Sequence, residues 1–162
     1  MNIPVGTIEE QRKAFSESNP FEKLAGLLRT GFDGYLIATI EGVSGLEEGL
    51  LLIRDKEITG AVFEALRINK QLFGPEALRL VFNLLRAKKG VFDVNRLSRQ
   101  QIDLIIAFNE KLVLSKPLDE SLLLKLEPSS YQPALVSKAF EIELESTDSR
   151  HGLLEKMGLG SI

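Results

Sequence analysis

The fold follows from the stretch Gly49-Leu50-Leu51-Leu52-Ile53-Arg54-Asp55-Lys56-Glu57-Ile58-Thr59-Gly60-Ala61 of this 162-residue chain. Residues 50–53 are continuously apolar, as in a buried strand, and residues 54–57 are all polar. An extended pattern then resumes over residues 58–68. The small residues Gly60 and Ala61 inside it indicate a bulge or a close backbone approach. The stretch therefore predicts two strands joined by a tight polar turn.

The neighbouring segments predict the rest of a small sheet. Residues 35–40 form a short β-branched and aromatic run, and the glycine-rich residues 41–49 connect it to the next strand. Connections this short leave no room for helical crossovers, so the three strands are expected to form an antiparallel meander. Residues 91–94 predict a further short strand. A sheet of three or four strands with helices on one side gives an α+β fold.

Three helices are expected to cover this sheet. The first spans residues 20–30, where Asn19 and Pro20 provide a start signal. The second opens at Gly74-Pro75-Glu76 and closes at Gly90, with a wide apolar face between them. The third begins at Ser98, and its predicted apolar face carries Ile102, Ile105, Ile106, Leu112 and Val113.

The chain is predicted to divide into an N-terminal arm (residues 1–19), an α+β domain (20–117) and a partly ordered acidic C-terminal extension (118–162). The extension holds four Lys and Arg against eight Asp and Glu. Its pattern predicts a short helix over residues 118–126, a link punctuated by Pro128 and Pro133, and a strand over residues 140–145 with an acidic face.

Composition excludes several classes of protein. The chain has no cysteine, which rules out disulfides, thiolate metal sites and thiol catalysis. No window approaches the roughly 18 to 20 apolar residues of a membrane span, and the start of the chain lacks the basic flank and apolar run of a secretion signal. The expected location is the cytoplasm, without membrane contact.

The patterned positions together resemble the PATAN-type domain, a module attached to bacterial response regulators, and a related archaeal family of unknown function. The resemblance covers residues 20–113 and implies a regulatory or adaptor role through protein contacts. Such domains commonly have Asp-Gly or Asn-Gly in the hairpin turn, where this chain has Asp55-Lys56, so a different turn type is expected. The positions that carry the resemblance are Leu24 to Leu28, Gly34 to Leu36, Gly49 to Ile53, Asp55 to Ala61, Gly74 to Leu78 and Lys89 to Phe92.

No catalytic, cofactor or metal site is predicted. The single histidine, His151, has Glu145 and Asp148 nearby in sequence, which is a weak ligand set, and an ordinary exposed histidine is the favoured interpretation. The adjacent carboxylates Glu9-Glu10 and Glu47-Glu48 are interpreted as solvated side chains. The glycines at 42, 45 and 49 precede a strand rather than a helix, so they do not form a nucleotide-binding loop.

Residues 74–99 carry six cations against two acids. Three interpretations stay open: a solvated helix face, which is favoured, a contact for an acidic protein or for the acidic extension, and a nucleic-acid surface, which is not favoured. Nucleic acid is disfavoured because Phe82 and Phe92 lie in apolar patterns typical of core residues. The predicted protein-contact residues are Arg79, Arg86, Lys88 and Lys89.

The leading hypothesis is a non-enzymatic protein-interaction or regulatory module with an unidentified protein partner, and a homodimer stays open. The alternative is a small-ligand sensor in which Gly60 and Ala61 leave room for a metabolite beside the sheet. Close packing on the sheet explains the same small residues. An enzyme of unrecognised type is the third hypothesis.

Overall fold

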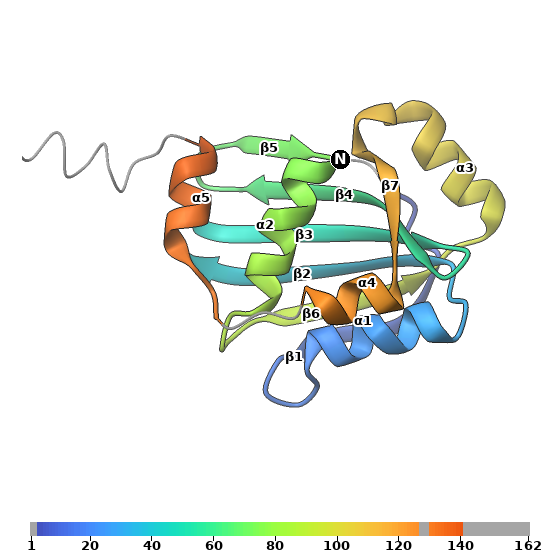
Figure 1. The fold of residues 1–162 in the computed structure, drawn as a ribbon, viewed down its shortest axis with the longest axis horizontal. Helices are drawn as coiled ribbons and strands as arrows, with labels where there is room; N and C mark the ends of the chain where they lie inside the picture. The colour runs from blue at the N-terminus through green and yellow to red at the C-terminus, as the bar shows by residue number, and fades with distance from the viewer. Residues whose placement is uncertain (1–2, 127–129, 141–162) are drawn as a thin grey trace, which may run out of the picture.

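The computed structural model describes residues 3–126 and 130–140, and it has the expected α+β architecture (Figure 1). These residues form one seven-stranded antiparallel sheet, five α-helices and one short 3-10 helix, η1. Along the chain the elements are β1 (Thr7–Ala14), α1 (Pro20–Arg29), β2 (Gly34–Gly42), β3 (Gly45–Arg54), β4 (Glu57–Ala65), β5 (Lys70–Phe73), α2 (Pro75–Leu85), β6 (Val91–Arg96), α3 (Arg99–Phe108), η1 (Glu110–Leu112), β7 (Val113–Asp119), α4 (Glu120–Lys125) and α5 (Pro133–Phe140).

The sheet is built around the expected meander. Its strand order is β1-β6-β2-β3-β4-β5, and β7 pairs with the part of β4 that β5 leaves free. The three-strand antiparallel meander β2-β3-β4 is confirmed, and the sheet is larger than expected because β1, β5 and β7 join it. Residues 7–14, which lie in the region described above as an arm, form an edge strand paired with β6.

The turn between β3 and β4 was expected to differ in type from an Asp-Gly or Asn-Gly hairpin turn, and it does not. Asp55 and Lys56 have φ angles of 51° and 64°, and Arg54 pairs with Glu57 across the loop. Positive φ at both central residues of a two-residue hairpin loop defines a type I′ turn. This is the turn that Asp-Gly and Asn-Gly favour, so here two residues with side chains adopt the same geometry.

Four helices cover the first face of the sheet. Side chains of α1, α2, α4 and α5 share one buried cluster with the inward-facing residues of β2, β3 and β4. Helix α2 crosses in front of the strands in Figure 1, and α1 and α4 lie side by side. Gly49 allows the close approach of α2, because a Cβ there would lie 2.9 Å from Cγ1 of Val81.

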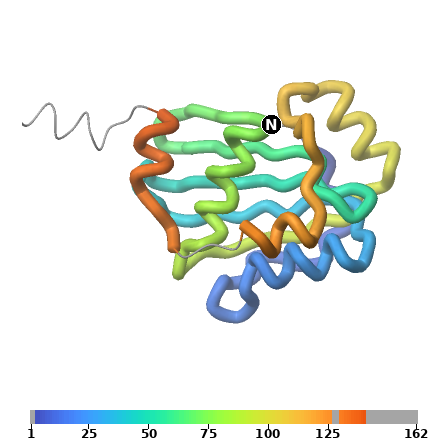
Figure 2. The backbone as a smooth tube through the Cα atoms, viewed as in Figure 1, coloured from blue at the N-terminus to red at the C-terminus, as the bar shows by residue number. Residues whose placement is uncertain are grey.

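The third helix packs on the opposite face of the sheet, so the expectation of three helices on one side is wrong. Ile102 and Ile105 of α3 join a second buried cluster with Tyr35, Leu50 and Leu52. The helix begins at a capping box formed by Ser98 and Gln101. In Figure 2, α3 lies at one end of the strands and α5 at the other.

Helix α3 also ends earlier than the apolar pattern indicated. It stops at Phe108, Leu112 belongs to η1, and Val113 starts β7. Leu112 still contributes to the second cluster, because η1 places it against Gly60 of β4. The apolar residues that predicted one long helix are therefore divided among a helix, a 3-10 turn and a strand.

The C-terminal extension packs on the domain as far as the structure describes it. The predicted helix over residues 118–126 is present as α4, although residues 113–119 form a strand. The predicted link contains α5, which starts at Pro133. A strand was expected over residues 140–145, but Phe140 ends this helix instead. Residues 141–145 lie outside the described residues. The extension contributes Leu118, Leu123, Val136 and Phe140 to the first core cluster.

No helix within the described ranges is both long enough and apolar enough to cross a membrane.

Candidate functional site

The four cations predicted to form a contact surface separate into two pairs. Arg79 on α2 and Arg86 just after it both line a pocket of about 200 Å³. Lys88 and Lys89 are exposed in the connection to β6 and do not line this pocket. Arg86 donates from Nη2 to the carbonyl oxygen of Leu126, at 3.3 Å. The structure therefore brings together only the two arginines.

The short helix α4 lies between two pockets. The pocket with Arg79 and Arg86 includes Leu126 at the end of α4, and a second pocket of about 280 Å³ lies between α1 and α4. Leu122, Leu124 and Leu126 are 44%, 55% and 47% exposed. We call these three leucines and the two flanking pockets the α4 surface. Arginines lie at the edges of this surface. Arg79 and Arg86 line the first pocket and Arg29 lines the second. Nη2 of Arg29 forms an ion pair with Oε1 of Glu120, at 2.6 Å.

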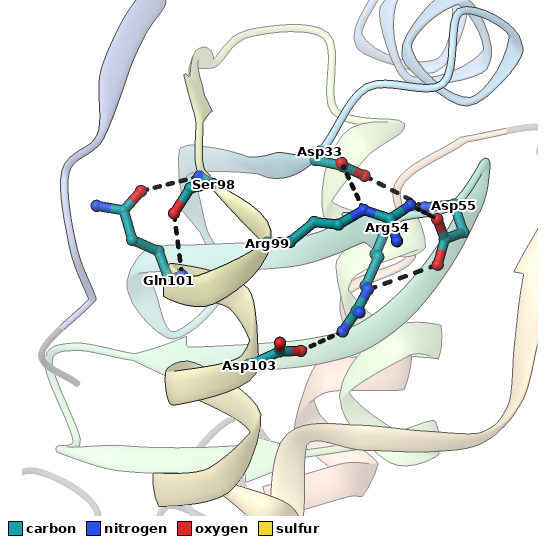
Figure 3. Close-up of polar contacts among 7 residues, drawn as sticks. All are labelled: Asp33, Arg54, Asp55, Ser98, Arg99, Gln101 and Asp103. Carbon is teal, nitrogen blue, oxygen red and sulfur yellow. Dashed lines mark hydrogen bonds and ion pairs between the residues drawn. The ribbon is translucent and has the colours of Figure 1, made fainter.

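An ion-pair cluster joins the β3–β4 turn to the start of α3 (Figure 3). Arg99 lies 3.7 Å from Asp33 and also contacts Asp55. Arg54 lies 3.5 Å from Asp55 and contacts Asp103 of α3. Every carboxylate of the cluster contacts an arginine, so these groups balance one another. The arrangement fixes the turn against α3 and leaves no carboxylate free for general acid–base chemistry.

The carboxylate pairs noted in the sequence do not form paired sites. Glu9 bonds to Arg96 and Glu10 lies 3.4 Å from Lys23. Glu47 and Glu48 are neighbours in β3 and point to opposite faces of the sheet, because successive strand residues alternate. Glu47 is fully buried on the first face, so its interpretation as a solvated side chain is wrong.

Glu48 lies on the second face, in a pocket that sequence reasoning missed. The pocket has a volume of about 190 Å³, and Glu64 and Tyr35 line it together with Glu48. Burial and the nearby carboxylates of Glu64 and Asp93 raise the pKa of Glu48. Glu48 and Glu64 are direct cross-strand partners. Such a like-charge pair destabilises a sheet.

We expect Glu48→Gln to raise the free energy of unfolding at neutral pH by about 0.5 kcal/mol, because it removes this repulsion. A raised pKa means that the folded state disfavours the ionised carboxylate. The penalty is therefore full above the raised pKa and disappears as the pH falls below the ordinary glutamate value of 4.5. Urea unfolding at several pH values checks this, with Glu41→Gln, at an exposed position of β2, as the control. An equal gain in both variants would contradict the assignment.

The space beside Gly60 is filled. A Cβ at this residue would lie 2.4 Å from Cδ1 of Leu112, and Ala61 is fully buried in the first cluster. The proposed room for a metabolite next to these two residues is therefore occupied by protein. Close packing, the simpler explanation of these small residues, accounts for them.

No arrangement of three or more His, Asp or Glu side chains suited to a metal ion occurs in residues 3–126 and 130–140. His151, Glu145 and Asp148 lie outside these ranges.

Comparison with known proteins gives one finding. No curated protein and no solved structure matches the chain significantly. A family model described as "uncharacterized protein conserved in archaea (DUF2226)" matches residues 1–109, which run from the start of the chain through α3. The match covers more than half of the chain and includes the meander, α1, α2 and α3. The chain therefore belongs to this archaeal family, DUF2226.

Proposed function

We propose that this chain is a non-enzymatic protein-interaction or regulatory module of the cytoplasm that contacts its partner through the α4 surface. The observation that carries the proposal is the exposure of Leu122, Leu124 and Leu126 between two pockets edged by arginines. Exposed apolar patches with polar rims are typical of protein contact sites. Arginine is also enriched in such sites, whereas lysine is depleted.

The chemistry of the α4 surface suits a partner segment that combines apolar side chains with carboxylates. Apolar side chains would enter the pockets beside Phe21 and Phe82, and carboxylates would meet Arg79 and Arg86. Arginine binds carboxylates in a bidentate manner, which adds orientation to the contact. The resemblance to PATAN-type domains supports a role of this kind, and we propose that the sheet and its helices correspond to such a domain.

The sheet edges are less suited to this role. The edge strand β1 carries two irregularities in its pairing with β6, and Arg12 within it has a φ of 47°. Bulges and charged residues on an edge hinder the addition of another strand. At the opposite edge, β5 has only four residues, and β7 contains Pro117. A helix-face contact is therefore favoured over strand addition.

Affinity purification from native lysate with the full-length chain tests the proposal. We expect a protein captured by the wild type to be lost with Leu124→Asp and with the double variant Arg79→Glu, Arg86→Glu. Leu104→Asp is a matched control, since Leu104 is also 55% exposed but lies on α3, across the sheet. Capture that is equal for all variants, or no specific capture by the wild type, would contradict the proposal.

A second candidate function is the sensing of a small ligand. The observation that favours it is the pocket beside Tyr35 and Glu48, on the opposite face of the sheet from α4.

A further inference from the structure

The first pocket of the α4 surface, which Arg79 and Arg86 line, is apolar apart from these two cations. Helices α2 and α5 contact each other beside it (Figure 1). Arg79 and Arg86 are seven residues apart, which corresponds to about 10 Å along a helix. The pocket therefore offers apolar surface and two separated positive charges. Its other lining residues come from α2, the end of α4 and α5: Pro75, Leu78, Phe82, Leu126 and Leu135.

Neither arginine is neutralised by a carboxylate among the described residues. Arg79 and Arg86 form no ion pair there. Arg86 is half-buried, and its described hydrogen bond goes to the backbone carbonyl of Leu126. Burial lowers the pKa of its guanidinium, so a carboxylate brought to this pocket would stabilise the charged form. Four other arginines each pair with an acidic side chain: Arg29, Arg54, Arg96 and Arg99.

The part of the chain that the structure describes stops close to this pocket. Helix α5 supplies Leu135 to the lining and ends at Phe140, whose ring packs on that of Phe63 with 5.9 Å between centroids. Leu135 and Phe140 are five residues apart, which is about 7.5 Å along a helix. The next five residues, 141–145, span up to about 17 Å when extended. They are therefore long enough to return to the pocket.

The sequence of residues 141–145 complements this lining. It reads Glu141-Ile142-Glu143-Leu144-Glu145, with alternating carboxylates and aliphatic side chains and no cation. In an extended segment the aliphatic side chains point to one side and the carboxylates to the other. With the aliphatic side chains in the pocket, the carboxylates lie at its rim, where long arginine side chains reach them. Arginine binds carboxylates in a bidentate manner.

We propose that residues 141–145 dock in the first pocket of the α4 surface of their own chain and cover it against the partner protein. Ile142 and Leu144 contact the apolar lining, and the glutamates pair with Arg79 and Arg86. Attachment to α5 gives the segment an effective concentration of roughly millimolar, so a weak contact is sufficient to occupy the pocket. The covering role rests on the proposed function, because it regulates access to the same surface.

A nitroxide spin label on the segment tests the docking in the full-length chain. The sequence has no cysteine, so Thr147→Cys provides a single attachment point. In the ¹⁵N-labelled protein, we expect the label to broaden the backbone amide signals of Leu78 and Phe82 on α2, relative to the reduced label. The amide signals of Leu104 and Phe108 on α3, which packs on the opposite face of the sheet, are expected to remain sharp.

Two pairs of substitutions separate docking from the nearness that the attachment to α5 itself imposes. Glu143→Gln with Glu145→Gln is expected to remove most of the broadening on α2. Asp148→Asn with Glu155→Gln removes the same charge from the chain after α5 and is expected to leave the broadening unchanged. This second pair is the matched control for the overall charge.

A charge exchange tests the pairing itself. Arg79→Glu with Arg86→Glu is expected to remove the broadening on α2. Adding Glu143→Lys with Glu145→Lys to the same chain is expected to restore it. Recovery of the broadening would show that the arginine variant is folded and that its loss of docking comes from charge.

The docking is overturned if the broadening on α2 persists in the Glu143 and Glu145 variant, since the arginines would then have another partner, such as Glu127, which follows Leu126 in the sequence. Equal losses in the two glutamine and asparagine pairs would also overturn it. A mixture of ¹⁵N-labelled chain without spin label and spin-labelled chain without ¹⁵N tests for a second copy. Broadening in the mixture as strong as within one chain would overturn docking in the same chain.

The spin-label measurement needs no partner protein, so its outcome is separate from that of the capture experiment. If the wild type captures nothing from the lysate, the proposed function fails and the docking result stands. Where a protein is captured, the variant with Glu143→Gln and Glu145→Gln is expected to capture more of it. Equal capture by this variant and the wild type would overturn the covering role.

Discussion

A chain shortened to end at residue 117 is expected to lose its cooperative unfolding transition. It lacks Leu118, Leu123, Val136 and Phe140, each at most 8% exposed in the main core. Each buried side chain of this size stabilises a fold by roughly 1.5–3 kcal/mol, so the four contribute about 6–12 kcal/mol. The total free energy of unfolding of a domain is roughly 5–15 kcal/mol. Circular dichroism during thermal and urea unfolding measures the effect.

A chain that ends at Phe140 is the control for this truncation. It retains every described residue, including the contact between Phe140 and Phe63, whose ring centroids lie 5.9 Å apart. We expect it to unfold cooperatively. If the chain ending at residue 117 unfolds with a midpoint close to that of this control, the packing of α4 and α5 on the sheet does not stabilise the fold.

This expectation determines how the extension can be studied. Because α4 and α5 complete the core, removing residues 118–162 would expose the apolar side chains of α1 and α2 that they cover. If the shortened chain failed to bind a partner protein, the cause would then be unfolding of the domain rather than removal of the contact surface. Single substitutions at exposed positions such as Leu124 avoid this difficulty, since a surface residue away from the core has a small effect on stability.

The meander and the main helices were predictable because their signals are local. Residues 50–53 are apolar on both faces, and both faces of β3 are indeed covered, one by α2 and the other by α3. Pro20 and Pro75 mark helix starts in the sequence and in the structure. Pro133 occupies the same position at the start of α5, but was interpreted as part of a link. Proline at the first helical position is favoured, so this signal could have been used.

Strand β7 was missed because its sequence carries little of a strand pattern. Only Leu114 and Leu118 of Val113–Asp119 are buried, and Pro117 argues against a central strand. An edge strand tolerates both features, since one side of its backbone needs no partner. The pairing of this strand with β4 is a long-range contact that local patterns do not encode.

The pocket was missed because its geometry depends on a bulge. The two-residue turn at residues 55–56 alone would place Glu47 opposite Glu64. The pairing shifts by one residue between Ile58 and Gly60, so Glu48 takes that place instead. A shift of one residue in the pairing moves the side chains of a strand to the opposite face of the sheet. The small residues Gly60 and Ala61 did indicate a bulge, but not its register.

The second large effect is expected for Tyr131→Phe, which we expect to lower the free energy of unfolding by about 3 kcal/mol. The Tyr131 hydroxyl donates to the carboxylate of Glu47, with distances of 2.9 Å to Oε1 and 3.1 Å to Oε2. It also accepts from the backbone N–H of Val43, at 3.1 Å. Loss of a hydrogen bond to a buried charge costs roughly 1.5–3 kcal/mol, and an unpaired buried N–H costs roughly 1–3 kcal/mol.

Glu47 explains why this single hydroxyl has so large an effect. The residue is fully buried and has no cation at ion-pair distance within the described residues. Its other donors are the backbone N–H and the hydroxyl of Ser44, at 3.2 Å and 3.0 Å from Oε1. Without Tyr131, Oε2 of this buried carboxylate loses its described donor, and the hairpin between β2 and β3 loses its bond to the C-terminal extension.

Tyr35→Phe is the matched control, because Tyr35 is the other tyrosine of the chain and its hydroxyl has no partner among the described residues. We expect it to change the free energy of unfolding by less than about 0.5 kcal/mol. Urea unfolding at neutral pH compares both variants with the wild type. Equal effects of the two substitutions would show that the bond between Tyr131 and Glu47 does not stabilise the fold.

The stabilisation by Tyr131 is expected to depend on pH in the alkaline range. Burial and the negative charge of Glu47 raise the pKa of Tyr131. A raised pKa means that the folded state retains the phenol proton at a pH where the unfolded chain has lost it. The contribution is therefore full below the ordinary tyrosine pKa of about 10 and falls as the pH rises above it. The difference in unfolding free energy between the wild type and Tyr131→Phe is therefore expected to shrink over this alkaline range, and a difference that stays constant would contradict this expectation.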